Sequence, residues 1–180
     1  MTAYKKSRAF ADKHITQMLD ILGALFYTKE CISVEVAPFK ADTKENTDFL
    51  VHFKENTKKD TKRDVPLKIS ARVRIFGKYD SSITFRASKE NSTKLEWQKM
   101  LEGHGDYMLY SGESMDGTHI DRYVLLDLDI VREFTKCSRD APTKSSIIDN
   151  GDGTGFIPYS LDRMLEYDPR VLVYKKEWYV

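Results

Sequence analysis

The sequence predicts an α+β fold, with a central mixed or antiparallel sheet, two main helices packed on it, and a β-rich extension at the C-terminal end. Residues 67–76 alternate strictly between apolar and polar side chains, which is typical of a strand that buries one face. Apolar residues recur at helical spacing over residues 8–26 and again within 93–103, with short strand-like segments between and after them.

No repeat, low-complexity segment or composition shift divides the chain of 180 residues. We therefore expect one domain over residues 1–180, made of a core over 8–128 and the extension over 129–180.

The first elements are a helix and two strands. Residues 8–26 predict an amphipathic helix whose apolar face is formed by Ala11, Ile15, Met18, Leu22, Leu25 and Phe26. Two short apolar segments follow, residues 32–37 and 48–53, and both predict strands. The connection 54–65 is highly charged and contains turn-forming residues, so it predicts a solvated loop between antiparallel strands.

The middle of the chain predicts two more strands and the second helix. The alternation over 67–76 places Lys68, Ser70, Arg72 and Arg74 together on the polar face, and residues 82–87 predict the next strand. Thr93 and Glu96 then have the spacing of a capping box, and Gly103 stands where a helix C-cap belongs.

The segments after this helix predict strands again. Residues 106–111 form one and residues 121–128 another, and the run Tyr123–Leu126 is apolar enough to be buried on both faces. Asp129 is placed to cap a short helix that ends at Phe134.

The C-terminal extension predicts a hairpin, a helical turn and a last strand. Residues 145–148 and 156–159 flank Asn-Gly and Asp-Gly steps, which is typical of a hairpin. Ser160 is placed to begin a helical turn, and residues 171–178 predict the final strand.

Composition restricts the classes of partner. The formal net charge is +1, so no global positive field draws the chain onto nucleic acid, and any such binding must come from a local patch. Two distant cysteines, Cys31 and Cys137, indicate a reducing compartment rather than a disulfide framework. No secretory signal and no apolar run of about 18 residues are found, so we expect a cytoplasmic protein with no membrane partner.

The strongest candidate site lies on two neighbouring predicted strands. Asp48 opens the strand 48–53, and Ser70, Arg72 and Arg74 project from one face of the strand 67–76. An acid beside such a polar set is typical of a two-strand active site or a phosphate-binding surface. It is equally typical of a salt-bridged sheet, in which Asp48 pairs with Arg72 or Arg74.

The predicted order helix, three strands, helix, strand resembles the αβββαβ core of the PD-(D/E)XK, or restriction-endonuclease-like, superfamily, over residues 8 to about 127. In that family an acid on the second strand and an acid-x-lysine on the third hold a divalent metal such as Mg²⁺ or Mn²⁺. Asp48 in Thr47-Asp48-Phe49 looks like the first motif. The segments TDFLV, ARVR, ITFR, LEGHGDY, DRYVLLDLD and NGDGTGF are also similar to uncharacterised proteins of bacteriophages and mobile elements, which bring no established activity.

The chain departs from this family pattern at the third strand. Arginine stands where the resemblance requires the second acid and the lysine, and arginine neither binds Mg²⁺ nor acts as a base near neutral pH. Glu35, on the preceding strand, or Asp12, on the first helix, could supply a migrated carboxylate beside Asp48. An active enzyme would then be a divalent-metal-dependent nuclease with Asp48 and Glu35 in catalytic roles.

A second interpretation keeps the fold without the metal. Arg72, Arg74 and Arg86 lie on neighbouring strands and form a guanidinium cluster suited to bidentate phosphate contacts. Tyr107, with Tyr110 and His104 nearby, follows the second helix and would stack on unpaired bases. We therefore expect a nucleic-acid-binding or processing protein of phage or mobile-element type with a degenerate site.

The alternative is a catalytically inactive module that binds another protein, as an inhibitor or accessory protein of host or phage machinery. The chain ends in two aromatic residues, Trp178 and Tyr179. They either dock on the domain with the final strand or form exposed anchors of the kind that interfaces favour.

Overall fold

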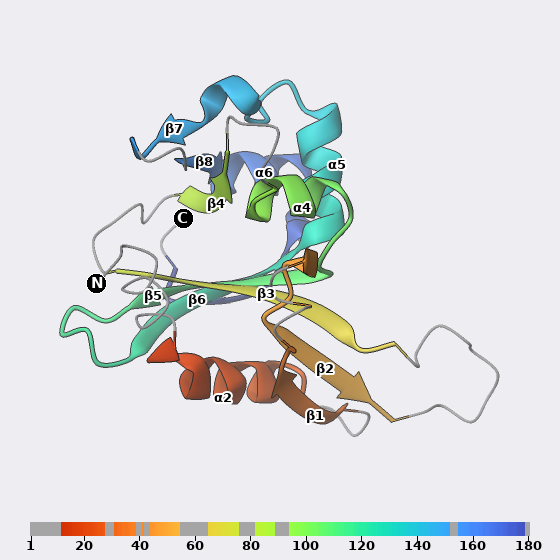
Figure 1. Cartoon of the computed structure of the whole chain (residues 1–180), viewed down its shortest axis with the longest axis vertical. Coiled ribbons are helices and arrows are strands. Elements are labelled where there is room, and N and C mark those ends of the chain that lie inside the picture. The colour runs from red at the N-terminus through yellow and green to blue at the C-terminus, as the bar shows by residue number, and fades with distance from the viewer. Residues whose placement is uncertain are drawn as a thin grey trace.

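A computed structural model of the chain describes residues 12–27, 31–38, 41, 44–54, 65–75, 82–88, 94–151 and 155–178. Within these residues the fold is α+β and has three layers (Figure 1). A six-stranded mixed sheet forms the middle layer, and helix α2 (Ile15–Leu25) covers one of its faces. The other face is covered by a three-stranded sheet and by helices α4 (Glu96–Leu101), α5 (Leu128–Cys137) and α6 (Leu161–Tyr167).

The main sheet contains, in spatial order, β1 (Cys31–Val36), β2 (Phe49–Phe53), β3 (Leu67–Arg74), β5 (Tyr107–Glu113), β6 (Ile120–Asp127) and β9 (Leu172–Lys176). Every neighbouring pair is antiparallel except β3 and β5, which are parallel. Parallel strands need a long crossover connection, and the chain supplies one that contains β4 and α4. The predicted mixed sheet is confirmed.

The second sheet contains β4 (Ser82–Ala87), β8 (Gly155–Ser160) and β7 (Ile148–Asp149), in the order β4-β8-β7. The predicted strand over 82–87 is therefore present, but it leaves the main sheet and pairs with β8 from the C-terminal extension. The predicted hairpin is confirmed as the antiparallel pair β7 and β8, but its first strand is shorter than the predicted 145–148, because Lys144–Ser146 form a 3-10 helix.

The C-terminal extension is more helical than the sequence predicts, and it is integrated with the rest. It contains α5 and α6 as well as three strands. Because β9 extends the main sheet beside β6 and β8 pairs with β4, the extension completes both sheets instead of forming a separate layer.

Two hydrophobic cores lie on the two sides of the main sheet. The lower core packs α2 on the sheet and includes the fully buried Leu22, Val51, Ile69 and Leu109. The upper core fills the space between the two sheets and the remaining helices, with Phe85, Met100, Tyr110, Phe134, Tyr159 and Met164 among its members. The prediction that Tyr123–Leu126 is buried on both faces is confirmed, because Tyr123 and Leu125 belong to the lower core and Val124 and Leu126 to the upper.

The ends of several elements follow the predicted signals, with one correction. Ser160 accepts a hydrogen bond from the backbone N–H of Arg163 and caps α6 as predicted. Gly103 follows α4 with a φ of +95°, the left-handed conformation expected just beyond a helix end. The cap of α5 is Asp127 and not Asp129, and the helix runs on to Cys137. Thr93 lies outside the described residues.

The polar face of β3 is covered by protein. Alternation along β3 is as predicted, with Ile69 in the lower core, but the opposite face lies beneath α4 and β4. Ser70 on that face is almost completely buried. The covering layer could not be inferred from the alternation, and it determines the geometry of the candidate site.

Candidate functional site

Three arginines of the sequence-predicted cluster converge between the two sheets. Arg72 and Arg74 project from the covered face of β3, and Tyr110 of β5 is the register partner of Arg72. The hydroxyl of Tyr110 lies 3.0 Å from that of Thr84 on β4, so this side of β4 faces the main sheet. Arg86 is two residues beyond Thr84 and projects from the same side.

The carboxylate of Glu96 contacts two of these residues, Arg72 through its side chain and Arg86 through its backbone. Its Oε2 accepts a 2.7 Å hydrogen bond from Nη1 of Arg72 and a 2.8 Å hydrogen bond from the backbone N–H of Arg86. The side chains of Arg72 and Glu96 are only 11% and 10% exposed. Glu96 therefore connects the first turn of α4 to one strand of each sheet.

The sequence assigned Glu96 to a different role. The capping-box contact at the start of α4 is made by Gln98, whose Oε1 accepts from the backbone N–H of Leu95 at 3.2 Å. Glu96 is thereby directed to Arg72. The sequence feature that could have indicated this role is an acid in the first turn of the helix that follows the strand carrying Arg86.

The electrostatics of the cluster are those of a crowded set of positive charges. Burial lowers the pKa of Arg72, Glu96 opposes this change, and the positive charges of Arg86 and Arg74 lower the pKa further. Arg74 and Arg86 are thus each within electrostatic reach of Arg72. Among these four side chains one carboxylate faces three cations, and Arg86 is exposed at the surface.

Asp48 has a backbone role at the start of β2. Its Oδ2 accepts a 2.6 Å hydrogen bond from the backbone N–H of Ala71, and its own N–H donates to the carbonyl of Ile69. The side chain thus satisfies a β3 amide beyond the end of the β2–β3 ladder. The predicted salt bridge between Asp48 and Arg72 is wrong, because the carboxylate partner of Arg72 is Glu96. The alternative pairing of Asp48 with Arg74 stays a prediction.

The other predicted carboxylates do not complete a metal site with Asp48. Glu35 of β1 lies beside His52, whose Nε2 is 3.0 Å from Oε1 of Glu35. Asp12 precedes α2 and is exposed, on the layer that covers the opposite face of the sheet. Across the residues that the structure describes, no three His, Cys, Asp or Glu side chains are grouped as metal ligands. These residues do not fit Mg²⁺ or Mn²⁺, and we derive no metal-dependent step.

Tyr107 lies away from the arginines. It is the register partner of Ile69, packs in the lower core, and its ring centroid is 6.1 Å from that of Phe26. Burial and the nearby Asp127, Asp106 and Asp129 raise its pKa. The nearest aromatic ring to Arg72 along β5 is Tyr110, which is completely buried. The structure therefore assembles Arg72, Arg74 and Arg86 but places Tyr107 on the opposite face of the sheet.

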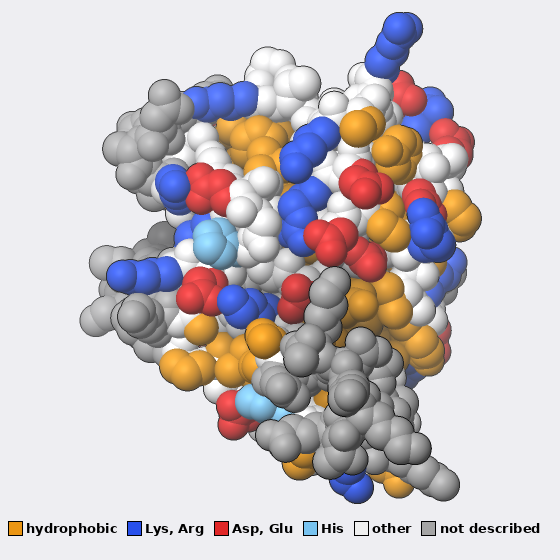
Figure 2. Space-filling view, turned by 90° about the vertical axis from the view of Figure 1, so that its right-hand side faces the viewer, with side chains coloured by type: hydrophobic (Ala, Val, Ile, Leu, Met, Phe, Trp, Pro, Cys, Tyr) orange, Lys and Arg blue, Asp and Glu red, His pale blue; other side chains and the backbone are white. Residues whose placement is uncertain are grey.

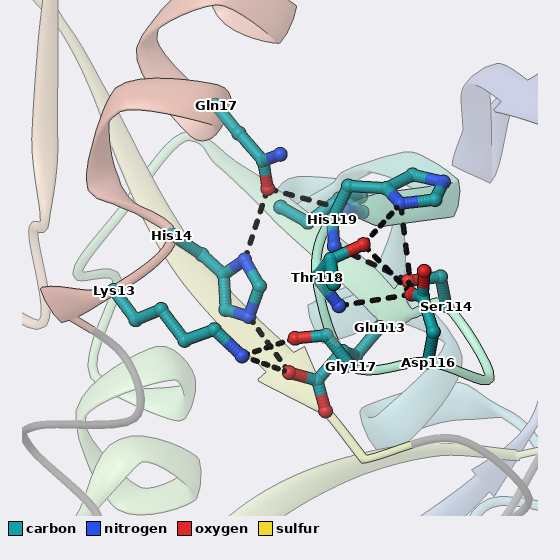
Figure 3. A network of polar contacts seen from close by, with 10 residues as sticks. Lys13, His14, Gln17, Glu113, Ser114, Asp116, Gly117, Thr118 and His119 are labelled. Atoms are coloured by element: carbon teal, nitrogen blue, oxygen red, sulfur yellow. Dashed lines mark hydrogen bonds and ion pairs between the residues drawn. The ribbon is translucent and has the colours of Figure 1, made fainter.

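A second polar cluster, which the sequence did not indicate, lies where the start of α2 meets the turn between β5 and β6 (Figure 3). The buried ring of His14 lies between Gln17 and Glu113, and Lys13 donates to Oε1 of Glu113 at 2.8 Å and to the carbonyl of Gly117. Burial opposes ionisation of Glu113, but hydrogen bonds from Lys13 and His14 outweigh it and lower the pKa.

The adjoining turn brings a serine, an aspartate and a histidine together without forming a catalytic triad. Oγ of Ser114 donates to Oδ1 of Asp116 at 2.6 Å and not to a histidine nitrogen. The N–H and hydroxyl of Thr118 donate to the same oxygen at 3.0 and 2.8 Å, and these hydrogen bonds lower the pKa of Asp116. A triad requires the histidine between serine and aspartate, so this arrangement is a stabilised turn.

The surface around α4 and α5 carries charges of both signs. On the face seen in Figure 2, Lys and Arg side chains are interspersed with Asp and Glu. This agrees with the near-zero net charge and indicates a local site rather than an extended positive groove.

Comparisons with family models, curated proteins and solved structures found no match to this chain. The resemblance to the PD-(D/E)XK core thus remains a prediction. No described helix combines the length and the apolar character needed to span a bilayer.

Proposed function

We propose that the protein binds nucleic acid through phosphate contacts at the arginine cluster and does so without metal-dependent cleavage. The observation that carries this proposal is the proximity of Arg74 and Arg86 to Arg72, whose guanidinium is paired with Glu96 beside the backbone of Arg86. Guanidinium groups suit phosphate oxygens, because they donate in a fixed fork and remain charged.

The three arginines have different roles in this proposal. Arg86 is exposed and contacts phosphate directly, and Arg74, which is half-buried, adds charge at the edge of the cluster. Arg72 is largely occupied by Glu96, so it positions the cluster and raises the local potential. The near-zero net charge predicts modest affinity that depends strongly on salt.

The test measures binding of labelled single- and double-stranded DNA and RNA by fluorescence anisotropy across a salt series. Loss of one phosphate contact lowers the slope of log K against log salt by about one. We expect Arg86→Ala to weaken binding and to lower the slope by this amount on the preferred nucleic acid. Arg163→Ala is the matched control, because Arg163 is an exposed arginine of α6.

Equal effects of the two substitutions would refute the assignment of Arg86. No binding by the wild-type protein to any of the four nucleic acids would refute the function itself. Cleavage that requires Mg²⁺ or Mn²⁺ would restore the metal-dependent interpretation.

A catalytically inactive protein-binding module is the second candidate. The observation that favours it is exposed apolar side chains on both outer strands of the main sheet: Ile32 and Val36 on β1, and Val173 and Tyr174 on β9. Outer strands offer backbone groups to an added strand of a partner. Purified protein should then recover one specific protein, and Tyr174→Lys should abolish that recovery.

A further inference from the structure

A fully buried histidine joins two segments that are distant in sequence. His14 lies at the start of α2 and its side chain is 1% exposed. Nδ1 is 2.9 Å from Oε1 of Gln17, and Nε2 is 3.1 Å from Oε1 of Glu113 at the end of β5. Histidine is the side chain whose ordinary titration falls near physiological pH, so its protonation state here has consequences.

The contact at Nδ1 fixes one proton. The backbone N–H of Ile120 donates to Oε1 of Gln17 at 3.1 Å, and a backbone N–H can only donate. The atom of Gln17 that faces His14 is therefore the oxygen, which can only accept. Nδ1 of His14 must carry a hydrogen.

The contact at Nε2 fixes the second proton. Oε1 of Glu113 also accepts from the ammonium group of Lys13 at 2.8 Å, and a carboxyl group paired with an ammonium group is a carboxylate at neutral pH. An ionised carboxylate accepts only, so Nε2 must donate as well. Both ring nitrogens then carry hydrogens, which is the imidazolium form.

We propose that His14 is an imidazolium in the folded protein and that the contacts of His14 with Gln17 and Glu113 form a pH-sensitive clasp between α2 and the β5–β6 turn. Loss of the Nε2 proton would leave the Nε2 lone pair facing a carboxylate oxygen, so two buried acceptors would oppose each other. The clasp is then weakened, while Lys13 still donates to Glu113 and Gly117 and Gln17 still accepts from Ile120.

The charged groups around the clasp come from each neighbouring element. Lys13 belongs to the same segment as His14, and Glu113 belongs to β5. Asp116 and His119 belong to the turn, where Nδ1 of His119 is 3.8 Å from Oδ1 of Asp116. On β6, Asp121 follows Ile120. Arg122 is directed away from the clasp, because its Cζ lies 5.8 Å from the ring of Trp178 in the upper core.

The direction of the response follows from the charged forms. The contact at Nε2 exists only while His14 is protonated, so the stability of the clasp is lost as the pH rises through that deprotonation. Glu113 contributes in the opposite direction, because its lowered pKa makes its stabilising effect disappear as the pH falls through that value. The clasp is closed between these two limits.

The experiment is heteronuclear NMR of the imidazole nitrogens in the wild-type protein, titrated between about pH 5 and 9. Loss of one signal set in His14→Gln assigns His14. We expect both ring nitrogens of His14 to be protonated at neutral pH. An unprotonated Nε2 of His14 at neutral pH would overturn the proposal.

Two further measurements test the mechanism. In Glu113→Gln we expect a neutral His14 that keeps its hydrogen on Nδ1, whereas the exposed-site control Glu166→Gln should behave as wild type. Amide hydrogen exchange in the wild type should show protection of Met18, whose N–H donates to the carbonyl of His14, and of Ile120, whose N–H donates to Gln17, falling together as His14 loses its second proton. Unchanged protection would mean that the clasp is not weakened, and this result does not depend on whether any variant folds.

Discussion

At the scale of single residues, Glu96 connects α4 to one strand of each sheet. One oxygen of its carboxylate accepts from a side chain of β3 in the main sheet and from a backbone N–H of β4 in the second sheet. The pair with Arg72 is almost completely covered. Removing one partner of such a pair leaves the other charge buried without compensation, whereas removing both costs far less.

We expect Arg72→Ala to lower the free energy of unfolding by about 3 kcal/mol, because the carboxylate of Glu96 loses its charged partner in a buried position. Urea denaturation measures this value. The double variant Arg72→Met with Glu96→Leu replaces both charges by apolar groups and should be closer to wild type than Arg72→Ala. If the double variant is less stable than Arg72→Ala, the ion pair stabilises the fold by more than apolar side chains at the same positions do.

Because of this geometry, stability and nucleic-acid binding are tested at different arginines. Because Arg86 is exposed, its substitution leaves the buried pair intact, and its backbone N–H still donates to Glu96. Arg86 is therefore the position at which nucleic-acid binding is tested with least effect on folding.

At the scale of elements, the direct junction of β6 and α5 explains why the N-cap of α5 is Asp127 and not the predicted Asp129. The strand ends at Asp127 and the helix begins at Leu128, with no connecting loop. Oδ1 of Asp127 accepts from the backbone N–H groups of Asp129 and Ile130 at 2.9 and 3.2 Å. Asp129 instead lies in the first turn and pairs with Arg132.

We expect Asp127→Ala to lower the free energy of unfolding by about 1 kcal/mol, because two amides at the start of α5 lose their acceptor. Asparagine is as good a cap as aspartate, so Asp127→Asn is the matched control and should stay within a few tenths of a kcal/mol of wild type. Thermal or urea denaturation decides the matter. Equal losses in the two variants would indicate that charge, and not capping, is the contribution of Asp127.

At the scale of the whole molecule, the main sheet is shared by two cores. Alternate residues of β6 point into the lower and the upper core. Because the same strands support both cores, unfolding of one core would disrupt the sheet on which the other core packs. Both tryptophans, Trp97 and Trp178, belong to the upper core. Of the two aromatic residues predicted to dock with the final strand, Trp178 is buried on the domain just beyond β9, and Tyr179 lies outside the described residues.

We expect the chain to unfold as one cooperative unit. Leu22→Ala removes a fully buried side chain from the lower core and should lower the free energy of unfolding by about 3 kcal/mol. Tryptophan fluorescence, which reports only the upper core, should shift by the same amount as far-ultraviolet circular dichroism. Met164→Ala, in the upper core, is the complementary variant. A tryptophan transition unaffected by Leu22→Ala would contradict a single domain.

Much of the fold was predictable because its signals are local. Periodicity located α2 and β3, the apolar run identified β6 as buried on both faces, and Ser160 marked the start of α6. The part of the candidate site that lies on one strand, Arg72 with Arg74, followed from alternation alone.

The rest depends on which strands pair and which layers meet. The sequence by itself determined the α+β class, the helix and strand positions and the arginine-bearing face. Only the tertiary structure decided that β4 joins a second sheet, that Glu96 is the partner of Arg72, that Tyr107 faces away, and that His14 meets Glu113. The physical reason is that backbone periodicity is set by neighbours in the chain, whereas burial and charge pairing are set by contacts between residues far apart in sequence.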